Sequence, residues 1–108
     1  MATTPVVTLT GTTIDLTLKD LHAALDDLPS ILEDKERGEL SEHERDVLSL
    51  EWIREVHHLR LVLDPAYRSG QMTPEQAERY RALLARLSEL LPVIQQLDFA
   101  LPGVSLHP

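Results

Sequence analysis

A heptad pattern of apolar residues in the last third of the chain constrains the fold more than any other feature. The positions alternate spacings of three and four residues and are Tyr80, Leu83, Leu87, Leu90, Ile94, Leu97 and Leu101. This spacing places the side chains on one face of a helix that packs against other helices. Leu84 and Leu91 widen that face. The pattern therefore predicts a mainly α-helical bundle, and 108 residues are enough for a single helical domain over residues 1–108.

Capping signals set the limits of this helix. Thr73 can act as the N-cap, the proline after it suits the first helical position, and Gln76 completes a capping box. We expect the helix to span residues 74–101, with a bend at Pro92, which lies off the heptad face. A non-helical tail over residues 102–108 should follow.

A second long helix is predicted over residues 41–69, beginning with a capping box formed by Ser41 and Glu44. Its apolar face divides into two stripes, the first made of Trp52, Val56, Leu59 and Leu63 and the second of Leu50, Ile53, His57 and Leu61. Two stripes predict a central helix that is covered on two sides. Pro65 should end or bend this helix, and Gly70 can close its last turn.

A first helix is predicted over residues 17–37. Its apolar residues recur at helical spacing and are Leu18, Leu21, Leu25 and Leu28. Thr17 and Asp20 resemble a capping box, Pro29 predicts a kink, and Gly38 suits the position after the end. Because the connection between the second and third helices is short, those two should form an antiparallel hairpin. The expected architecture is therefore a three-helix bundle.

The threonine-rich N-terminus, residues 1–16, alternates apolar and polar residues. Thr10 and Gly11 could form the turn of a short β-hairpin, and an extended arm is the alternative. The two stripes of the second helix and the wide face of the third need more cover than three helices provide. We therefore expect a homodimer.

Negative charge is concentrated in one third of the chain. The formal net charge is −8, and residues 15–46 hold 11 acidic and four basic residues, a net −7. This charge argues against binding to nucleic acid or to an anionic membrane. A basic protein partner is the electrostatically favourable one, although an acidic surface can also serve only solubility.

Composition indicates a cytoplasmic protein. No apolar run is long enough to span a membrane, and the first residues lack the pattern of a signal peptide. The chain has no cysteine, which excludes disulfides, thiolate catalysis and cysteine metal sites and fits a reducing compartment.

No catalytic motif is present. The sequence contains no nucleophile elbow, no glycine-rich phosphate loop and no His-Glu-x-x-His motif, so we predict no enzymatic activity, no catalytic residue and no cofactor. Arg79, Arg81 and Arg86 are balanced by Glu75, Glu78 and Glu89, which indicates a solvent-facing side of the third helix.

A metal site is the alternative to a pure interaction protein. Glu55 and His58 form a Glu-x-x-His pair of the kind found in di-metal helical bundles, and Glu51 lies one turn earlier. A second copy would have to complete such a site. The simpler interpretation is a solvated helix edge, and on that interpretation we assign no metal ligand.

Two further residues of the second helix have a structural and a functional interpretation. His57 is either a half-buried histidine or a group that titrates near neutral pH. Trp52, the single tryptophan, is either a core residue or an interface anchor. Together the patterns predict a small acidic interaction module: an adaptor, an assembly chaperone, an inhibitor or an antitoxin-like partner.

Overall fold

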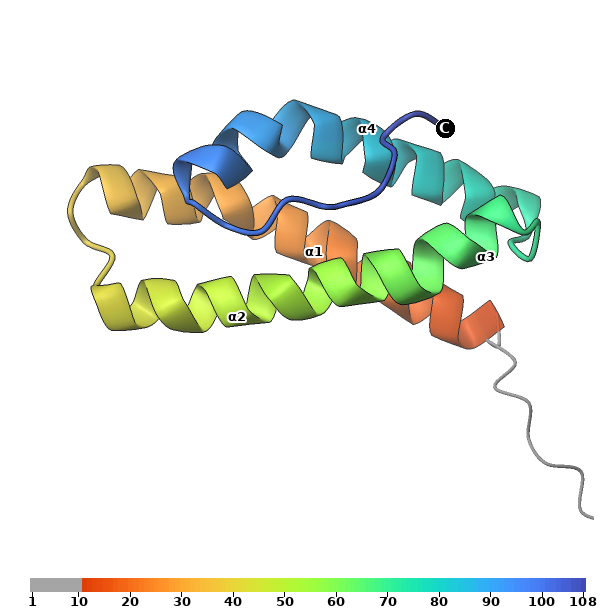
Figure 1. Ribbon diagram of the computed structural model, residues 1–108, viewed down its shortest axis with the longest axis horizontal. Helices are drawn as coiled ribbons and strands as arrows, with labels where there is room; N and C mark the ends of the chain where they lie inside the picture. The colour runs from red at the N-terminus through yellow and green to blue at the C-terminus, as the bar shows by residue number, and fades with distance from the viewer. Residues whose placement is uncertain (1–10) are drawn as a thin grey trace, which may run out of the picture.

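The computed structural model describes residues 11–108, and every regular element within them is a helix (Figure 1). In chain order these are α1 (Gly11–Glu36), α2 (Glu42–His58), the π-helix η1 (Leu59–Leu63), α3 (Asp64–Arg68) and α4 (Pro74–Gln96). Because α2, η1 and α3 follow one another without a break, they form one long helical rod. The prediction of a mainly α-helical fold is confirmed for the described part of the chain.

Helix α1 begins at Gly11 instead of residue 17, so the prediction of an arm or strand is wrong for residues 11–16. The rest of that predicted arm lies outside the described residues. Ile14 explains the earlier start, because it extends the spacing of the leucines and is buried with them. Thr17 lies inside the helix, where its hydroxyl donates to the Thr13 carbonyl at 2.7 Å, and it does not cap it.

A buried glutamine fixes the start of α1 against the start of α4. Gln76 closes the predicted capping box with Thr73. Its Nε2 also donates to the Gly11 carbonyl and to Asp15 Oδ1, both at 3.1 Å. One side chain therefore caps α4 and holds the first turn of α1, which is why it is almost fully buried.

Two helix ends use a residue in the left-handed conformation. Gly38 follows α1 with φ 71°, as predicted, and allows the next amide to reach the Asp34 carbonyl at 2.8 Å. Asp98 takes the same role after α4 with φ 57°. Helix α4 therefore ends at Gln96 and not at residue 101, and Leu101 is exposed instead of buried.

The long rod continues through Pro65, where an end or a bend was predicted. Proline lacks an amide hydrogen, and in an α-helix its ring would clash with the carbonyl four residues earlier, that of Leu61. The chain widens into η1 just before this point, and the Asp64 amide donates to the Leu59 carbonyl, five residues back. The π-helical turn is thus the local adjustment that carries the helix past the proline.

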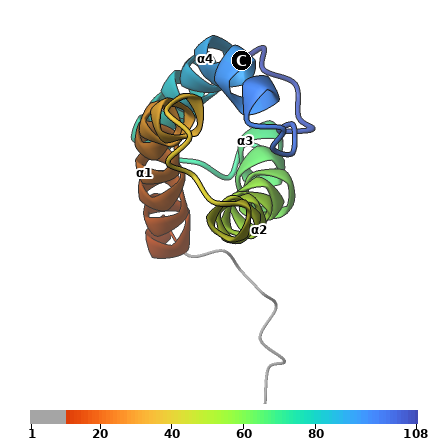
Figure 2. The ribbon, with the colours of Figure 1, turned by 90° about the vertical axis from the view of Figure 1, so that its left-hand side faces the viewer.

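Helix α1 contacts both of the other helical segments. Figure 2 shows α1, α4 and the long rod at the corners of a triangle, and α1 packs against α4 and against α2 and η1. The first stripe of the long rod (Trp52, Val56, Leu59 and Leu63) is buried, as expected. In the second stripe Leu50 and Leu61 are 67% and 74% exposed, and His57 is exposed as well. Within one chain the second stripe is therefore uncovered, and whether a second copy covers it stays a prediction.

The C-terminal segment, residues 97–108, turns back from the end of α4 and runs along the space between α4 and α2 (Figure 1). Phe99 is buried, and Val104 and Leu106 pack on the core. Trp52 Nε1 donates to the Ala100 carbonyl at 2.6 Å, and Arg68 Nη2 donates to the His107 carbonyl at 2.9 Å. This segment covers the side of the core that α1 leaves open.

A tyrosine links α4 to the far end of the rod. The Tyr80 hydroxyl donates to Asp64 Oδ1 at 2.7 Å, and its ring lies 4.8 Å from the ring of Tyr67. Burial, together with this hydrogen bond, raises the pKa of Tyr80 far above its usual range. The hydroxyl therefore stays protonated and acts as a permanent donor.

Leu61 and Leu63 test which stripe of the rod is core. Leu63 is 0% exposed, so Leu63→Ala should lower the free energy of unfolding by about 2–5 kcal/mol. Leu61→Ala, two residues away and exposed, should change the free energy of unfolding of the single chain by no more than about 0.5 kcal/mol, measured at a dilution at which the chain is monomeric. Urea unfolding followed by circular dichroism measures both. Equal losses would contradict the burial pattern described here.

Candidate functional site

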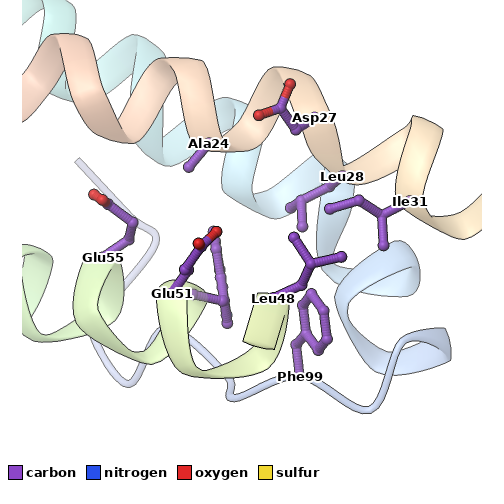
Figure 3. Close-up of a pocket in the computed structure, with 9 residues that line it drawn as sticks. Ala24, Asp27, Leu28, Ile31, Leu48, Glu51, Glu55 and Phe99 are labelled. Carbon is purple, nitrogen blue, oxygen red and sulfur yellow. The ribbon is translucent and has the colours of Figure 1, made fainter. Parts of the chain in front are cut away.

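A cleft of about 110 Å³ lies between α1 and α2 (Figure 3). Its lining comes from three parts of the chain: Ala24, Asp27, Leu28 and Ile31 from α1, Leu48, Glu51, Trp52 and Glu55 from α2, and Phe99 from the C-terminal segment. We refer to it as the α1–α2 cleft. It is the place where α1, the long rod and the C-terminal segment meet.

The lining combines an apolar floor with charges of one sign. Six of its nine residues are apolar or aromatic, and the other three are Asp27, Glu51 and Glu55. The carboxylates of Glu51 and Glu55 extend from α2 toward α1 in Figure 3. A site of this kind suits a group that has an apolar body and a positive end.

Glu55 is the most perturbed acid of the cleft. Burial raises the pKa of its carboxyl above the ordinary value near 4.5, the charge of Asp20 adds to the rise, and His58 and Arg54 oppose it. Its Oε2 is buried and has no hydrogen-bond partner, because the imidazole Nδ1 of His58 is 4.0 Å away, beyond hydrogen-bond distance. The cleft therefore contains a carboxylate oxygen whose bonding capacity is unused.

The acids on the other side of α1 are neutralised by α4. Arg86 Nη2 contacts Asp26 Oδ1 at 2.5 Å, and Arg79 Nη1 contacts Asp15 Oδ1 at 3.4 Å. These arginines pair with α1, which corrects the expectation that they are balanced by glutamates of their own helix. Arg81 is exposed, as expected. The two sides of α1 thus differ in charge, and the side toward α2 carries the uncompensated acids.

A wider hollow of about 460 Å³ lies on the α1–α4 side and carries mixed charge. Its lining includes Asp15, Lys19 and Arg79. Because acid and base already pair there, this hollow offers less to a charged ligand than the α1–α2 cleft does.

The structure separates the residues of the predicted metal alternative. Glu51 and Glu55 line the cleft, but His58 approaches only Glu55. Among residues 11–108 no group of three or more histidine, aspartate or glutamate side chains is arranged to hold a metal ion. A metal site would therefore need ligands from a second copy, as the sequence analysis required.

Other singled-out residues have structural roles. Trp52 is a core residue whose indole nitrogen is satisfied by the Ala100 carbonyl, as its core interpretation predicted. His57 is exposed, so neither a half-buried nor a buried titrating histidine is present at this position. His22 Nδ1 lies 3.2 Å from Arg86 Nη1, and His43 is exposed.

Sequence reasoning missed Asp27 and Phe99 as parts of the site. Asp27 is one of many acids in residues 15–46, and no spacing marks it as different from its neighbours. Phe99 lies in a stretch that was predicted to be helical, so its return toward α2 was not foreseen. Only the end of α4 at Gln96 brings it to the cleft.

Comparison of the chain with protein-family models, with curated proteins and with solved structures finds no match. No helix within residues 11–108 is both long and apolar enough to cross a membrane.

The raised pKa of Glu55 predicts a pH-dependent stability. As the pH rises, Glu55 loses its proton in the unfolded chain before it does so in the folded chain, because its pKa is higher in the folded state. Between these two pKa values the folded state binds more protons than the unfolded state. The free energy of unfolding therefore falls as the pH rises from the ordinary pKa to the raised one. Glu55→Gln should therefore increase the free energy of unfolding at pH 7 and leave it nearly unchanged at pH 4. Glu51→Gln, at an exposed carboxylate one turn earlier, is the control.

Urea unfolding of the three proteins between pH 4 and pH 7 measures this difference. A Glu55→Gln variant that is less stable than the parent chain at pH 7 would contradict it, as would an equal gain from Glu51→Gln.

Proposed function

We propose that this chain is a small acidic helical interaction module, without catalytic activity of its own, that binds a protein segment carrying basic side chains. The observation that carries the proposal is the α1–α2 cleft, whose lining combines an apolar floor with three acids, of which Glu51 and Glu55 extend from α2 toward α1 (Figure 3). In this role the chain acts as an adaptor, an assembly chaperone, an inhibitor or an antitoxin-like partner. Its lack of cysteine suits work in the cytoplasm.

The chemistry of the cleft matches a lysine or arginine side chain. Either residue has an aliphatic stem that can lie on Leu28, Leu48 and Phe99 and a cationic head that can reach the acids. The free oxygen of Glu55 would then gain a charge-assisted hydrogen bond. The gain is larger in a partly buried cleft than on an open surface, because solvent screens the charges less.

The size of the cleft supports binding over catalysis. A volume of about 110 Å³ is well below the several hundred Å³ of a usual substrate pocket and fits part of one side chain. The binding energy of such a partner would come from anchoring a few side chains on a helical surface.

We also propose that the chain self-associates. The support is the exposure of Leu50 and Leu61 along one side of the long rod, which three helices and the C-terminal segment leave uncovered. The metal-binding alternative gains no support from the arrangement of Glu51, Glu55 and His58 within one chain.

Trp52 provides a direct assay for the cleft, because it is the only tryptophan and lines the site. A helical peptide of leucine and lysine, free of tryptophan, should change Trp52 fluorescence on titration, and binding should weaken with added salt. The same peptide with glutamate in place of lysine should not bind. Identical titration curves for the two peptides would exclude the proposed recognition.

Variants locate the peptide on the chain. Glu55→Gln should weaken binding of the lysine peptide about tenfold, the loss expected when a charge-assisted hydrogen bond of about 1.5 kcal/mol is removed. Asp27→Asn should weaken it by a smaller factor. Asp34→Asn removes the same charge from an exposed position of α1 outside the cleft and should have little effect. Equal effects of Asp27→Asn and Asp34→Asn would indicate attraction by net charge alone.

A further inference from the structure

We propose that the surface beneath the C-terminal segment binds an extended peptide, and that residues 98–108 occupy it as an internal ligand which a partner segment of the same pattern displaces. We call it the segment-binding surface. Its defining residues are Trp52 of α2, Arg60 of η1 and Arg68 of α3, which follow one another along the long rod (Figure 1). This role is distinct from the proposed function, because it does not use the acids of the α1–α2 cleft.

The rod holds the segment by its backbone carbonyls. Trp52 Nε1 donates to the Ala100 carbonyl at 2.6 Å. Arg68 Nη2 donates to the carbonyls of Ser105 and His107, at 3.3 and 2.9 Å. Every peptide has such carbonyls, so these three bonds can guide an extended chain along the rod whatever its side chains are. In peptide recognition of this kind, main-chain hydrogen bonds supply affinity and side-chain pockets supply specificity.

Three positions of the segment add sequence specificity. Phe99 is 5% exposed, and Pro102 is buried as well. At Gly103 a Cβ atom would lie 3.1 Å from Arg60 Nε, and the φ of 70° lies in the left-handed region that favours glycine. The segment-binding surface therefore fits an aromatic residue, any two residues, a proline and then a glycine.

The segment is attached in a way that allows release while the helices stay folded. Among residues 11–108, no hydrogen bond between backbone groups holds residues 100–108. Segments that lack such bonds open locally at a lower free energy than the whole chain unfolds. The chain leaves α4 through Asp98, whose φ of 57° is less favourable for aspartate than for glycine. Release at Asp98 relieves this strain and leaves α4, which ends at Gln96, intact.

An internal ligand weakens the apparent binding of every partner segment. Residues 98–108 are tethered beside the surface, so an added peptide competes with a ligand at high effective concentration. Binding of such a peptide to the parent chain should therefore be weak. A substitution that weakens the internal segment should strengthen binding of the added peptide by the same factor, because the surface is then free more often.

Competition with a synthetic peptide tests the proposal. The probe has the sequence of residues 98–108 with fluorescein at its N-terminus, and fluorescence anisotropy measures its binding to the full chain. Phe99→Ala in the chain should tighten binding of the probe about tenfold, because it removes the largest buried side chain of the internal segment. Leu101→Ala in the chain, in the same segment but 56% exposed, is the matched control and should leave binding unchanged.

Variants of the probe test the pattern. With the Phe99→Ala chain as receptor, a probe carrying Phe99→Ser should bind about tenfold more weakly than the unchanged probe, since it cannot fill the vacated position. A probe carrying Gly103→Val should also lose binding, because its side chain would meet Arg60. A probe carrying Leu101→Ser should bind like the unchanged probe. Equal binding of all four probes would rule out the pattern.

The single indole of the chain reports occupancy of the surface. Trp52 is the only tryptophan, so its indole N–H gives one signal in a proton–nitrogen correlation spectrum. Phe99→Ala in the chain should shift this signal, because the bond to the Ala100 carbonyl is weakened. Saturating probe should return the signal toward its position in the parent chain, since the peptide supplies the same carbonyl.

Two results would overturn the proposal. One is a Phe99→Ala chain that keeps its helices by circular dichroism and binds the probe no more tightly than the parent chain. The other is an indole signal that saturating probe leaves unchanged. If Phe99→Ala loses its helices, Gly103→Val in the chain carries the same test, because it weakens the segment beyond Pro102.

The test is independent of the proposed function. The probe contains neither lysine nor arginine, so its binding does not report on the acids of the α1–α2 cleft. Failure of this probe leaves the proposed recognition of basic segments standing, and failure of the lysine peptide leaves the segment-binding surface standing.

Discussion

The contact of one face of α1 with two other helical segments is the constraint on which the rest of the structure depends. Its buried side, from Ile14 to Leu28, contacts α4 and the long rod at once. Both α4 and the long rod pack on α1, and α2 and α4 do not close on each other along their length as a simple hairpin would. The C-terminal segment fills that third side, anchored through Trp52 and Arg68. The cleft beside Phe99 follows from this arrangement, as does the exposure of Leu50 and Leu61 on the long rod.

The sequence predicted the helix ends well where only neighbouring residues determine them. The capping boxes at Ser41 and Thr73 and the glycine after α1 depend on only a few neighbouring residues, and all three form as expected. The heptad face of α4 is buried from Tyr80 to Leu97, apart from partly exposed Leu90. These features need no knowledge of the rest of the fold.

Predictions failed where a distant contact overrides a local pattern. Residues 11–16 alternate like a strand, but Ile14 gains burial and Gln76 donates a hydrogen bond to the Gly11 carbonyl only in the folded bundle. Asp98 adopts a positive φ that sequence patterns assign to glycine, and Arg45, at 3.2 Å from its carboxylate, stabilises it there. Which of two equal stripes on α2 is buried depends on where α1 lies, and periodicity alone does not carry that information.

The candidate site was predictable in kind but not in composition. Negative charge and a possible basic partner follow from counting residues, whereas the participation of Asp27 and Phe99 depends on tertiary packing. The pairing of Arg79 and Arg86 with α1 was equally hidden, because glutamates of their own helix offered partners at helical spacing. Only this pairing shows which acids of α1 remain uncompensated.

Helix α2 departs from the usual pattern of burial on the side that faces α1. It buries the carboxylate of Glu55, which costs free energy unless the charge finds a partner. An apolar side chain at this position would avoid that cost in a chain selected only to fold. Natural sequences break such local rules mainly where function requires it. The unpartnered oxygen of Glu55 is therefore the feature of α2 that the proposed binding of a cation in the cleft would account for.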